Sequence, residues 1–516
     1  MNSLTGHTTR LSPWVIFLAF FNIILHWAFY NTLGFHRDEL LYFSLGQHLA
    51  AGYASVPPFI GFIAWLMINT LGYSLLSARI IPMILSGVMV VIVASISKEL
   101  KGKQYAQVLA SIAFITAPFN LRTYFLFMPV FFDCFFWSIL ILLFLKWINT
   151  KDDRYLMLSG LAAGLGMLNK YLIAVEFLSI LFVFIFTDQR RIFTTKYFYF
   201  AILLTLTVFS PNLIWQLKNN LPVLTHMQAL HDSQLVHVSR ISFFTDQLFI
   251  GCMAIFLVIP GLFFVLLSGS MKAYRPLLVA SLLVLLILAI LRGKSYYTIG
   301  LYPFWIAAGG VFWENRIRQL AIKIALPLFI ILLTLPVIPY GLPVFKTARL
   351  VEYFAAARKS IGFDAALRWE TGRIHNLPQD YSDMLGWDEI AVITAKAYQQ
   401  VNDKTACMIY TENYGEAGAV MVLGKKYGLP EPVCFSESFW YWFPRNPSHE
   451  INEMIYINDK LGDDIQGLFA DCRLVGQVSD TLAREYGTGI WLCKNPRTSF
   501  NEFWKQRIPL VTNPFL

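Results

Sequence analysis

Four ionisable residues in a row, His36, Arg37, Asp38 and Glu39, follow directly on the first long apolar segment of the chain, residues 14–33. Charge beside hydrocarbon is poorly solvated, so such a cluster at a membrane boundary is a candidate site. A carboxylate pair there can take a proton from a hydroxyl group or hold a metal ion. The alternative is a solvated loop with a chance acidic pair.

A third candidate carboxylate, Asp133, lies near the start of another apolar segment, among the aromatic residues of the stretch 128–137. Asp in this position often caps a helix. If Asp133 lies at the same membrane level as Asp38, the two acids could instead face one polar cavity. One carboxylate would then act as the base, and the other would bind a hydroxyl group or a cation.

The stretch 292–298, Arg-Gly-Lys-Ser-Tyr-Tyr-Thr, places two cations and two phenols within seven residues. Such groups suit a phosphate near the membrane interface, although an ordinary interfacial belt of aromatic and basic residues looks similar. Other cations assigned to the same side could converge there. The candidate phosphate-binding residues are Arg37, Arg79, Arg122, Lys170, Arg292, Lys294, Tyr296 and Tyr297.

The composition indicates an integral membrane protein. Of 516 residues, 56% are hydrophobic and 14% are charged, whereas a soluble domain carries about 25% charged residues. The net charge of +9 needs no nucleic acid partner, since basic residues gather in cytoplasmic loops of membrane proteins. We interpret the N-terminal apolar segment as a retained helix and not as a cleaved signal peptide.

The fold class expected is an α-helical polytopic membrane protein with about eleven spans, each close to the roughly 20 residues that a bilayer requires. With the N-terminus inside, the inner loops hold about twice as many Lys and Arg as the outer loops, as the positive-inside rule requires. The expected spans are 12–33, 80–97, 105–119, 130–147, 155–169, 171–187, 197–215, 245–269, 277–291, 297–313 and 320–340.

One short apolar segment, residues 59–71, decides the orientation of everything after it. It follows Pro57-Pro58, and we interpret it as a helix lying in the outer membrane interface. If it crossed the bilayer, Asp38 and Asp133 would face opposite sides.

Residues 346–516 mix charged residues with short apolar runs. They predict a small soluble α/β domain on the outer side, after a membrane domain formed by residues 1–345. The expected elements are strands at 406–410 and 432–435, helices at 388–399 and 416–427, and a terminal hairpin of 473–478 with 489–493. Cys472 and Cys493 flank this hairpin, so we expect a disulfide between them.

Several motifs occur in an order that resembles the GT-C class of glycosyltransferases that use polyprenyl-phosphate sugars. Within this class, the chain is similar to bacterial relatives of protein O-mannosyltransferases and of the aminoarabinose lipid A transferase (glycosyltransferase families 39 and 83). The Asp-Glu loop is the most specific motif. The motifs lie at residues 34–42, 52–58, 76–79, 169–171, 210–212, 293–297 with 302–303, and 413–417.

The resemblance implies an inverting transferase in the plasma (inner) membrane, with a cavity that opens to the exoplasmic (periplasmic) face. The donor would be an undecaprenyl-type polyprenyl-phosphate sugar, and the acceptor a hydroxyl group of a lipid, glycan or protein. Asp38 would be the base, oriented with Glu39. Asp133 would be a second acid, and Lys294 and Tyr297 would contact the lipid phosphate.

Two further points follow from the resemblance. Some relatives hold a divalent metal ion near the acidic loop, which here would involve His36, Asp38 and Glu39. The aminoarabinose enzymes carry a Lys near the proline segment, where this chain has Ala54-Ser55-Val56, which argues against lipid A as the acceptor.

A transporter or flippase of a lipid-linked anion is the competing hypothesis. It would use the same outer cations and intramembrane acids, but it would need matching polar groups on the inner half of the membrane. The inner loops hold mainly flanking Lys and Arg residues, so the transferase is favoured.

Overall fold

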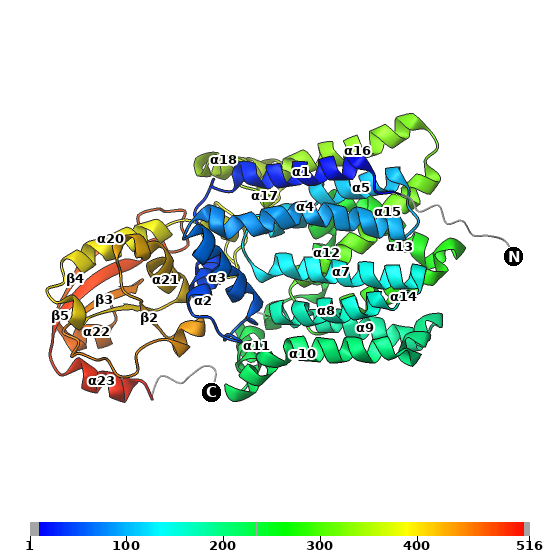
Figure 1. Ribbon diagram of the computed structural model, residues 1–516. Helices are drawn as coiled ribbons and strands as arrows, with labels where there is room; N and C mark the ends of the chain where they lie inside the picture. Colours follow the sequence, from blue (N-terminus) through cyan, green and yellow to red (C-terminus); the bar gives the residue numbers. More distant parts are fainter. Residues whose placement is uncertain (1–9, 234, 510–516) are drawn as a thin grey trace. The chain divides into compact units, whose positions relative to one another are not determined.

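The computed structural model describes residues 10–233 and 235–509 (Figure 1). The chain forms two compact units, each assembled from separate stretches of sequence. Unit 1 comprises the N-terminal segment up to Tyr30 together with Arg79–Trp215 and Leu230–Val344. Unit 2 comprises Asn31–Ala78, Gln216–Ala229 and the chain from Phe345 onward.

Each segment expected to span the membrane is helical, because an apolar stretch satisfies its backbone hydrogen bonds internally only as a helix. Within the described residues, six helical stretches are long and apolar enough to cross a bilayer: Leu75–Glu99, Pro129–Thr150, Lys196–Lys218, Arg240–Leu267, Gly269–Ile290 and Leu320–Gly341. The expected helical membrane fold is confirmed. The helices that match the expected spans are α1 (Pro13–Phe29), α4 (Leu75–Glu99), α5 (Gln104–Thr116), α7 (Pro129–Thr150), α8 (Arg154–Asn169), α9 (Ile173–Ile185), α10 (Lys196–Lys218), α12 (Arg240–Gly251), α13 (Ile255–Leu267), α14 (Arg275–Ile290), α15 (Tyr302–Arg316) and α16 (Leu320–Thr334).

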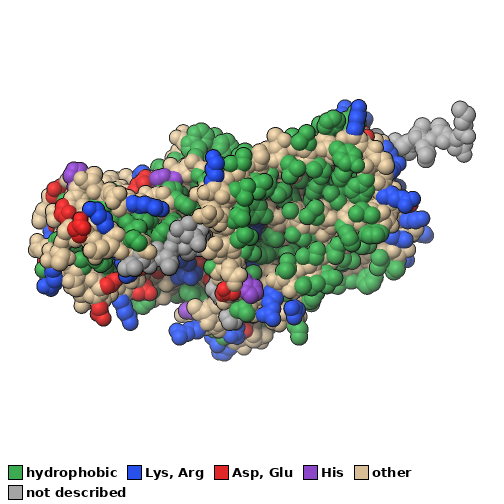
Figure 2. Space-filling view, turned by 90° about the horizontal axis from the view of Figure 1, so that it is seen from below, with side chains coloured by type: hydrophobic (Ala, Val, Ile, Leu, Met, Phe, Trp, Pro, Cys, Tyr) green, Lys and Arg blue, Asp and Glu red, His purple; other side chains and the backbone are tan. Residues whose placement is uncertain are grey.

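Large apolar side chains cover the outside of these helices. On α1, Trp14, Phe17 and Phe20 are each more than 60% exposed, a degree of apolar exposure that a soluble surface avoids. Figure 2 shows such side chains gathered over the membrane helices, with Lys and Arg at one end of them. Unit 1 therefore has the surface of a protein that faces lipid.

Unit 2 contains a five-stranded sheet in the order β2-β1-β3-β5-β4. The strands are β1 (Cys407–Thr411), β2 (Val433–Cys434), β3 (Glu453–Asn458), β4 (Phe469–Gln477) and β5 (Gly489–Pro496). β1 pairs in parallel with β2 and β3, while β5 pairs in antiparallel fashion with β3 and β4. Helix α20 (Trp387–Gln399) packs against β3, β4 and β5, so the expected α/β layer is confirmed.

The terminal hairpin has the expected strands, and its register places Cys472 opposite Cys493. Both residues are nevertheless free thiols, so the expected bridge between them is absent from the structure. The short apolar runs of the C-terminal region correctly predict β1, β2, β4 and β5, whereas the central strand β3 was not predicted.

Two early segments belong to the same compact unit as the sheet. Helix α2 (Arg37–Gln47) and helix α3 (Phe59–Leu71) form part of unit 2. The Ala54 N–H donates to the Ser438 hydroxyl at 3.0 Å, and the His48 ring stacks on Trp442 with 4.3 Å between ring centroids. Hydropathy alone placed the early segment, residues 31–78, in a separate domain from the sheet.

Candidate active site

The acidic loop becomes the first turn of helix α2. His36 is the N-cap residue, and its Nδ1 atom accepts the Asp38 N–H at 3.0 Å. The Glu39 carboxylate reaches back to accept the His36 N–H at 2.9 Å, which completes a capping box. Glu39 is fully buried, and its carboxylate therefore holds the helix end in place beside Asp38.

Asp38 points from this helix end toward a residue that lies far away in the sequence. Its Oδ1 atom accepts the Tyr414 hydroxyl at 2.9 Å. Tyr414 begins α21 (Tyr414–Gly418), whose N-cap Asn413 accepts the N–H groups of Gly415 and Glu416. The tyrosine hydroxyl fixes one carboxylate oxygen of Asp38, and that half-buried side chain keeps a second oxygen for another contact.

The Arg37 side chain lies over the ring of Tyr414. Its guanidinium group is 4.1 Å from the centroid of the Tyr414 ring, within the range of a cation–π contact. A Cβ atom at Gly415 would lie 2.9 Å from Arg37 Cγ and 2.6 Å from Trp387 Cη2. Glycine is therefore required where the helices that carry Asp38 and Tyr414 meet.

The loop that precedes α2 is anchored to a buried acid of the C-terminal region. The Arg37 N–H donates to the Asp383 carbonyl at 2.9 Å, and Arg484 pairs with the Asp383 carboxylate at 3.2 Å. Burial raises the pKa of Asp383 against the opposing effects of His36 and Arg484. The backbone just before Asp38 is therefore tied to the C-terminal region through Asp383.

A second carboxylate from the C-terminal region, Glu437, lies near Asp38. Burial raises the pKa of Glu437, His226 and a hydrogen bond from Ser55 oppose that rise, and Asp38 adds to it. The Glu437 backbone has a φ of +56°, which is unusual for a residue with a side chain. Nothing in the local sequence marked this residue.

A separate polar cluster forms within unit 1 around Asp133. Asp133 lies in the first turns of α7, is buried, and accepts the Trp137 indole N–H at 3.1 Å. Its charge interacts with that of Lys170, whose Nζ atom is 4.5 Å from the centroid of the Tyr297 ring and 5.5 Å from that of Tyr296.

Lys294 completes the cluster, since its charge acts on Lys170. Among the candidates for phosphate binding, the fold thus brings together Lys170, Lys294, Tyr296 and Tyr297 beside Asp133. Two cations and two phenols around one acid provide several donors for an anion.

Both neighbours of Lys170 are tied to other helices. The Asn169 amide donates to the Pro129 carbonyl at 2.9 Å, which joins the end of α8 to the start of α7. The Tyr171 hydroxyl donates to the Asn212 side chain at 2.7 Å. The motifs at 169–171 and 210–212 therefore act together, by positioning Lys170 next to Asp133.

Three other candidate cations have different surroundings. Arg292 donates to the Val236 carbonyl at 2.5 Å. Arg79 is fully buried, donates to the Tyr30 carbonyl and lies 4.5 Å from the centroid of the Phe125 ring. Arg122 lies in the short helix α6 (Pro118–Thr123) and is half-buried. Arg79 therefore serves as a fixed internal cation, and Arg292 as a brace for the segment before Lys294.

Sequence reasoning overlooked one acid of unit 1, Glu176 in α9. It is 1% exposed, neither carboxylate oxygen has a hydrogen-bond partner within the described residues, and its charge interacts with that of Asp133. A lone acid inside an expected span was the signal that could have found it.

The residues expected to hold a divalent metal ion do not fit that role. His36 Nδ1 accepts an N–H, so Nε2 carries the proton of the neutral ring and offers no lone pair to a metal. The Glu39 carboxylate is used in the cap. Within residues 10–233 and 235–509, no three His, Cys, Asp or Glu side chains are arranged to hold a metal ion.

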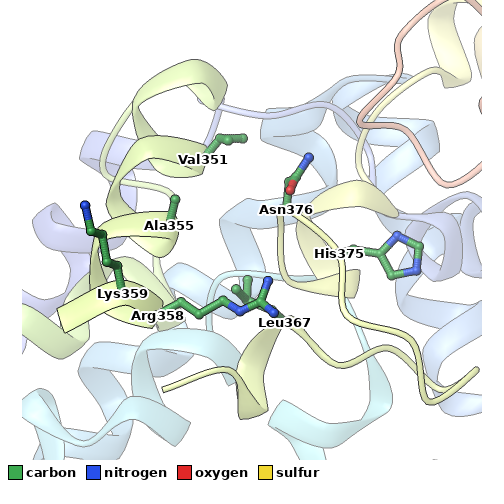
Figure 3. Close-up of a pocket in the computed structure, with 7 residues that line it drawn as sticks. All are labelled: Val351, Ala355, Arg358, Lys359, Leu367, His375 and Asn376. Atoms are coloured by element: carbon green, nitrogen blue, oxygen red, sulfur yellow. The ribbon is translucent and has the colours of Figure 1, made fainter. Parts of the chain in front are cut away.

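Unit 2 also has a cavity of about 360 Å³ beside α18 (Thr347–Ile361) (Figure 3). Figure 3 shows the Arg358 side chain running beneath Leu367, while Lys359 points away from the other residues. No acid lines this cavity, so it offers no carboxylate base. The lining residues are Val351, Ala355, Arg358, Lys359, Leu367, His375 and Asn376.

Comparisons with known proteins agree with this picture. Residues 55–215 match the family model of dolichyl-phosphate-mannose-protein mannosyltransferases. The structure of ArnT from Cupriavidus metallidurans bound to undecaprenyl phosphate has a TM-score of 0.63 at 12% identity, over 94% of this chain and 98% of that one. The structure of the same ArnT in the apo state has a TM-score of 0.59 at 11% identity, over 93% of this chain and 97% of that one.

The arabinofuranosyltransferase AftD from Mycobacteria has a TM-score of 0.50 at 13% identity, over 95% of this chain and 40% of that one. By sequence, no curated protein matches. The expected resemblance is confirmed, and the family match and the shared fold together indicate a glycosyltransferase. The chain is a multi-pass membrane protein with the fold of the GT-C glycosyltransferases.

Proposed function

We propose that this protein transfers a sugar, with inversion, from an undecaprenyl-type polyprenyl-phosphate donor to a hydroxyl group of a lipid, glycan or protein. We place both the reaction and the C-terminal domain, residues 346–516, on the exoplasmic (periplasmic) side of the inner membrane. The observation that carries the proposal is Asp38, a carboxylate held at a capped helix end by the Tyr414 hydroxyl.

Asp38 acts as the general base. The acceptor oxygen attacks the anomeric carbon while its proton passes to the Asp38 carboxylate, a step worth about 10²- to 10⁴-fold in rate. The bond between the anomeric carbon and the phosphate oxygen breaks, and its electron pair stays on that oxygen. The products are the inverted glycoside and polyprenyl phosphate.

The cluster around Asp133 receives the phosphate. Lys170 and Lys294 supply positive charge, and the Tyr296 and Tyr297 hydroxyls supply donors, so negative charge that develops on the leaving oxygen is stabilised. Asp133 attracts Lys170 and thereby orients it. ArnT, whose fold is similar, binds undecaprenyl phosphate, which supports a phosphate of the same lipid class here.

The test is direct turnover. Purified protein in nanodiscs is given a panel of undecaprenyl-phosphate-linked hexoses and pentoses together with an envelope extract from cells that lack this protein. Release of undecaprenyl phosphate that depends on both the extract and Asp38 supports the proposal. Passage of intact lipid-linked sugar across the bilayer, without cleavage, contradicts it and favours a flippase.

A further inference from the structure

Two polar atoms beside Asp38 have hydrogen-bonding capacity that the protein does not use. The Arg37 Nε–H group is a buried donor without a partner among the described residues, and Glu437 Oε2 is a buried acceptor without one. A buried polar group without a partner destabilises the fold. Two of opposite kind, near one carboxylate, indicate a place for a polar ligand.

The chain holds Glu437 there at a conformational cost. A φ of +56° is strained for a non-glycine residue and persists only where its surroundings impose it. The hydroxyl of the next residue, Ser438, accepts the Ala54 N–H at 3.0 Å, and the neighbouring Ser55 acts on the Glu437 carboxyl by lowering its pKa. The loop at 52–58 thus holds the residue that follows Glu437 and lies close to the Glu437 carboxyl.

The charges around these atoms identify the class of ligand. The site holds two acids, Asp38 and Glu437. Two basic residues, Arg37 and His226, lower the pKa of Glu437, whereas Asp38 raises it. With charges of both signs present, the site suits neither a simple anion nor a simple cation. Arg37 and Glu437 form no ion pair within 4 Å among the described residues. A group that both donates and accepts, such as a carbohydrate hydroxyl, satisfies both unused atoms.

We propose that Arg37 and Glu437 form a hydroxyl-binding subsite for carbohydrate beside the catalytic Asp38. Arg37 Nε donates to one hydroxyl oxygen, and Glu437 Oε2 accepts from the same hydroxyl or from its neighbour on the ring. The C-terminal region then completes the active site, with Tyr414 to orient the base and Glu437 to hold the sugar. This inference rests on the proposed function, because it requires a sugar substrate.

The first arm of the test compares lipid binding. Affinities of undecaprenyl phosphate and of undecaprenyl-phosphoryl-mannose are measured for wild-type protein, Glu437→Gln and Glu437→Gly. Glycine tolerates the positive φ, so Glu437→Gly removes the carboxylate and leaves thermal stability equal or higher. Glu431→Gln is the matched control, since Glu431 lies in the same unit and pairs with His48 at its surface.

The second arm measures the KM for the acceptor, with the envelope extract as the probe. If the subsite binds the donor sugar, the Glu437 variants lose about 10- to 100-fold in affinity for the mannosyl lipid, with undecaprenyl phosphate unchanged. If it binds the acceptor, donor affinity is unchanged and the KM for the extract rises by a similar factor. Either result supports the subsite.

Three results overturn it. Folded Glu437 variants that match the control in both arms show that the carboxylate binds no sugar. An equal loss of undecaprenyl phosphate affinity shows that Glu437 acts on the phosphate or on the fold. A loss that EDTA reproduces in the wild-type protein assigns Glu437 to a bound cation. Wild-type protein that binds neither lipid contradicts the proposed function itself, and the subsite with it.

Discussion

Replacing Asp38 with Asn tests the role of the base most sharply, because the structure predicts that this change spares the fold. The capping box uses the side chains of His36 and Glu39 and only the backbone of Asp38. An Asn oxygen can still accept the Tyr414 hydroxyl now bonded at 2.9 Å. Exchanging a charged for a neutral acceptor costs about 1 kcal/mol, which lowers the melting temperature by no more than about 4 °C.

The same change removes the proton acceptor. General base catalysis contributes about 10²- to 10⁴-fold, so Asp38→Asn loses about 2.7 to 5.4 kcal/mol of transition-state stabilisation. The assay is release of undecaprenyl phosphate at saturating donor, with thermal unfolding recorded on the same preparation. Tyr414→Phe, which keeps the base but loses its orienting hydroxyl, loses about 10-fold. Equal losses for the two variants, or activity of Asp38→Asn near the wild-type level, would refute the assignment.

Three further changes have definite expected outcomes. Lys294→Ala weakens undecaprenyl phosphate binding by about 10- to 100-fold, measured with the lipid alone; an unchanged affinity contradicts a phosphate role for this cluster. Gly415→Ala places a methyl group 2.6 Å from Trp387 and destabilises the protein by about 1–3 kcal/mol, seen as a lower melting temperature; an unchanged one would show that this contact is looser than described. Burial raises the pKa of Glu416 well above its usual value, so its contribution to stability is present while it is protonated and is lost as the pH rises through the folded-state pKa. Glu416→Gln should therefore gain thermal stability relative to wild type as the pH rises from 5 to 8, and a difference independent of pH would contradict this.

Hydropathy predicted the helices of unit 1 because desolvation acts on each segment by itself. Four of the five strands of the C-terminal region were predicted for a similar reason, since short apolar runs such as residues 406–410 are typical of buried strands. These are local properties of the chain, and each can be judged from a window of neighbouring residues.

The candidate site was predicted only in part, because its contacts join distant residues. Asp38 was recognisable from its place at a membrane boundary, but its partner Tyr414 follows 376 residues later. The placement of Lys170 near Asp133 depends on hydrogen bonds from Asn169 and Tyr171 to other helices. No local pattern marks Glu437, whose backbone conformation is imposed by the tertiary contacts of its neighbours.

The early segment, residues 31–78, was predicted to belong to the membrane domain, whereas it clusters with the C-terminal region. The reason is again that its contacts are with distant residues. Its helices α2 and α3 lie between the apolar helices α1 and α4 in the sequence, yet Ala54 and His48 contact residues of the C-terminal region. Packing between segments more than 300 residues apart leaves no periodic signal in either segment. Hydropathy therefore predicts the helices of this segment without showing what they pack against.

Mass spectrometry of the cell envelope most directly tests the claim that Asp38 drives sugar transfer from a polyprenyl phosphate. Cells lacking this protein should lose one glycosylated envelope component and accumulate the corresponding undecaprenyl-phosphate-linked sugar. Wild-type protein should restore both, and Asp38→Asn, present at the same level in the membrane, should restore neither. An envelope that is unchanged without the protein, or fully restored by Asp38→Asn, would contradict the account.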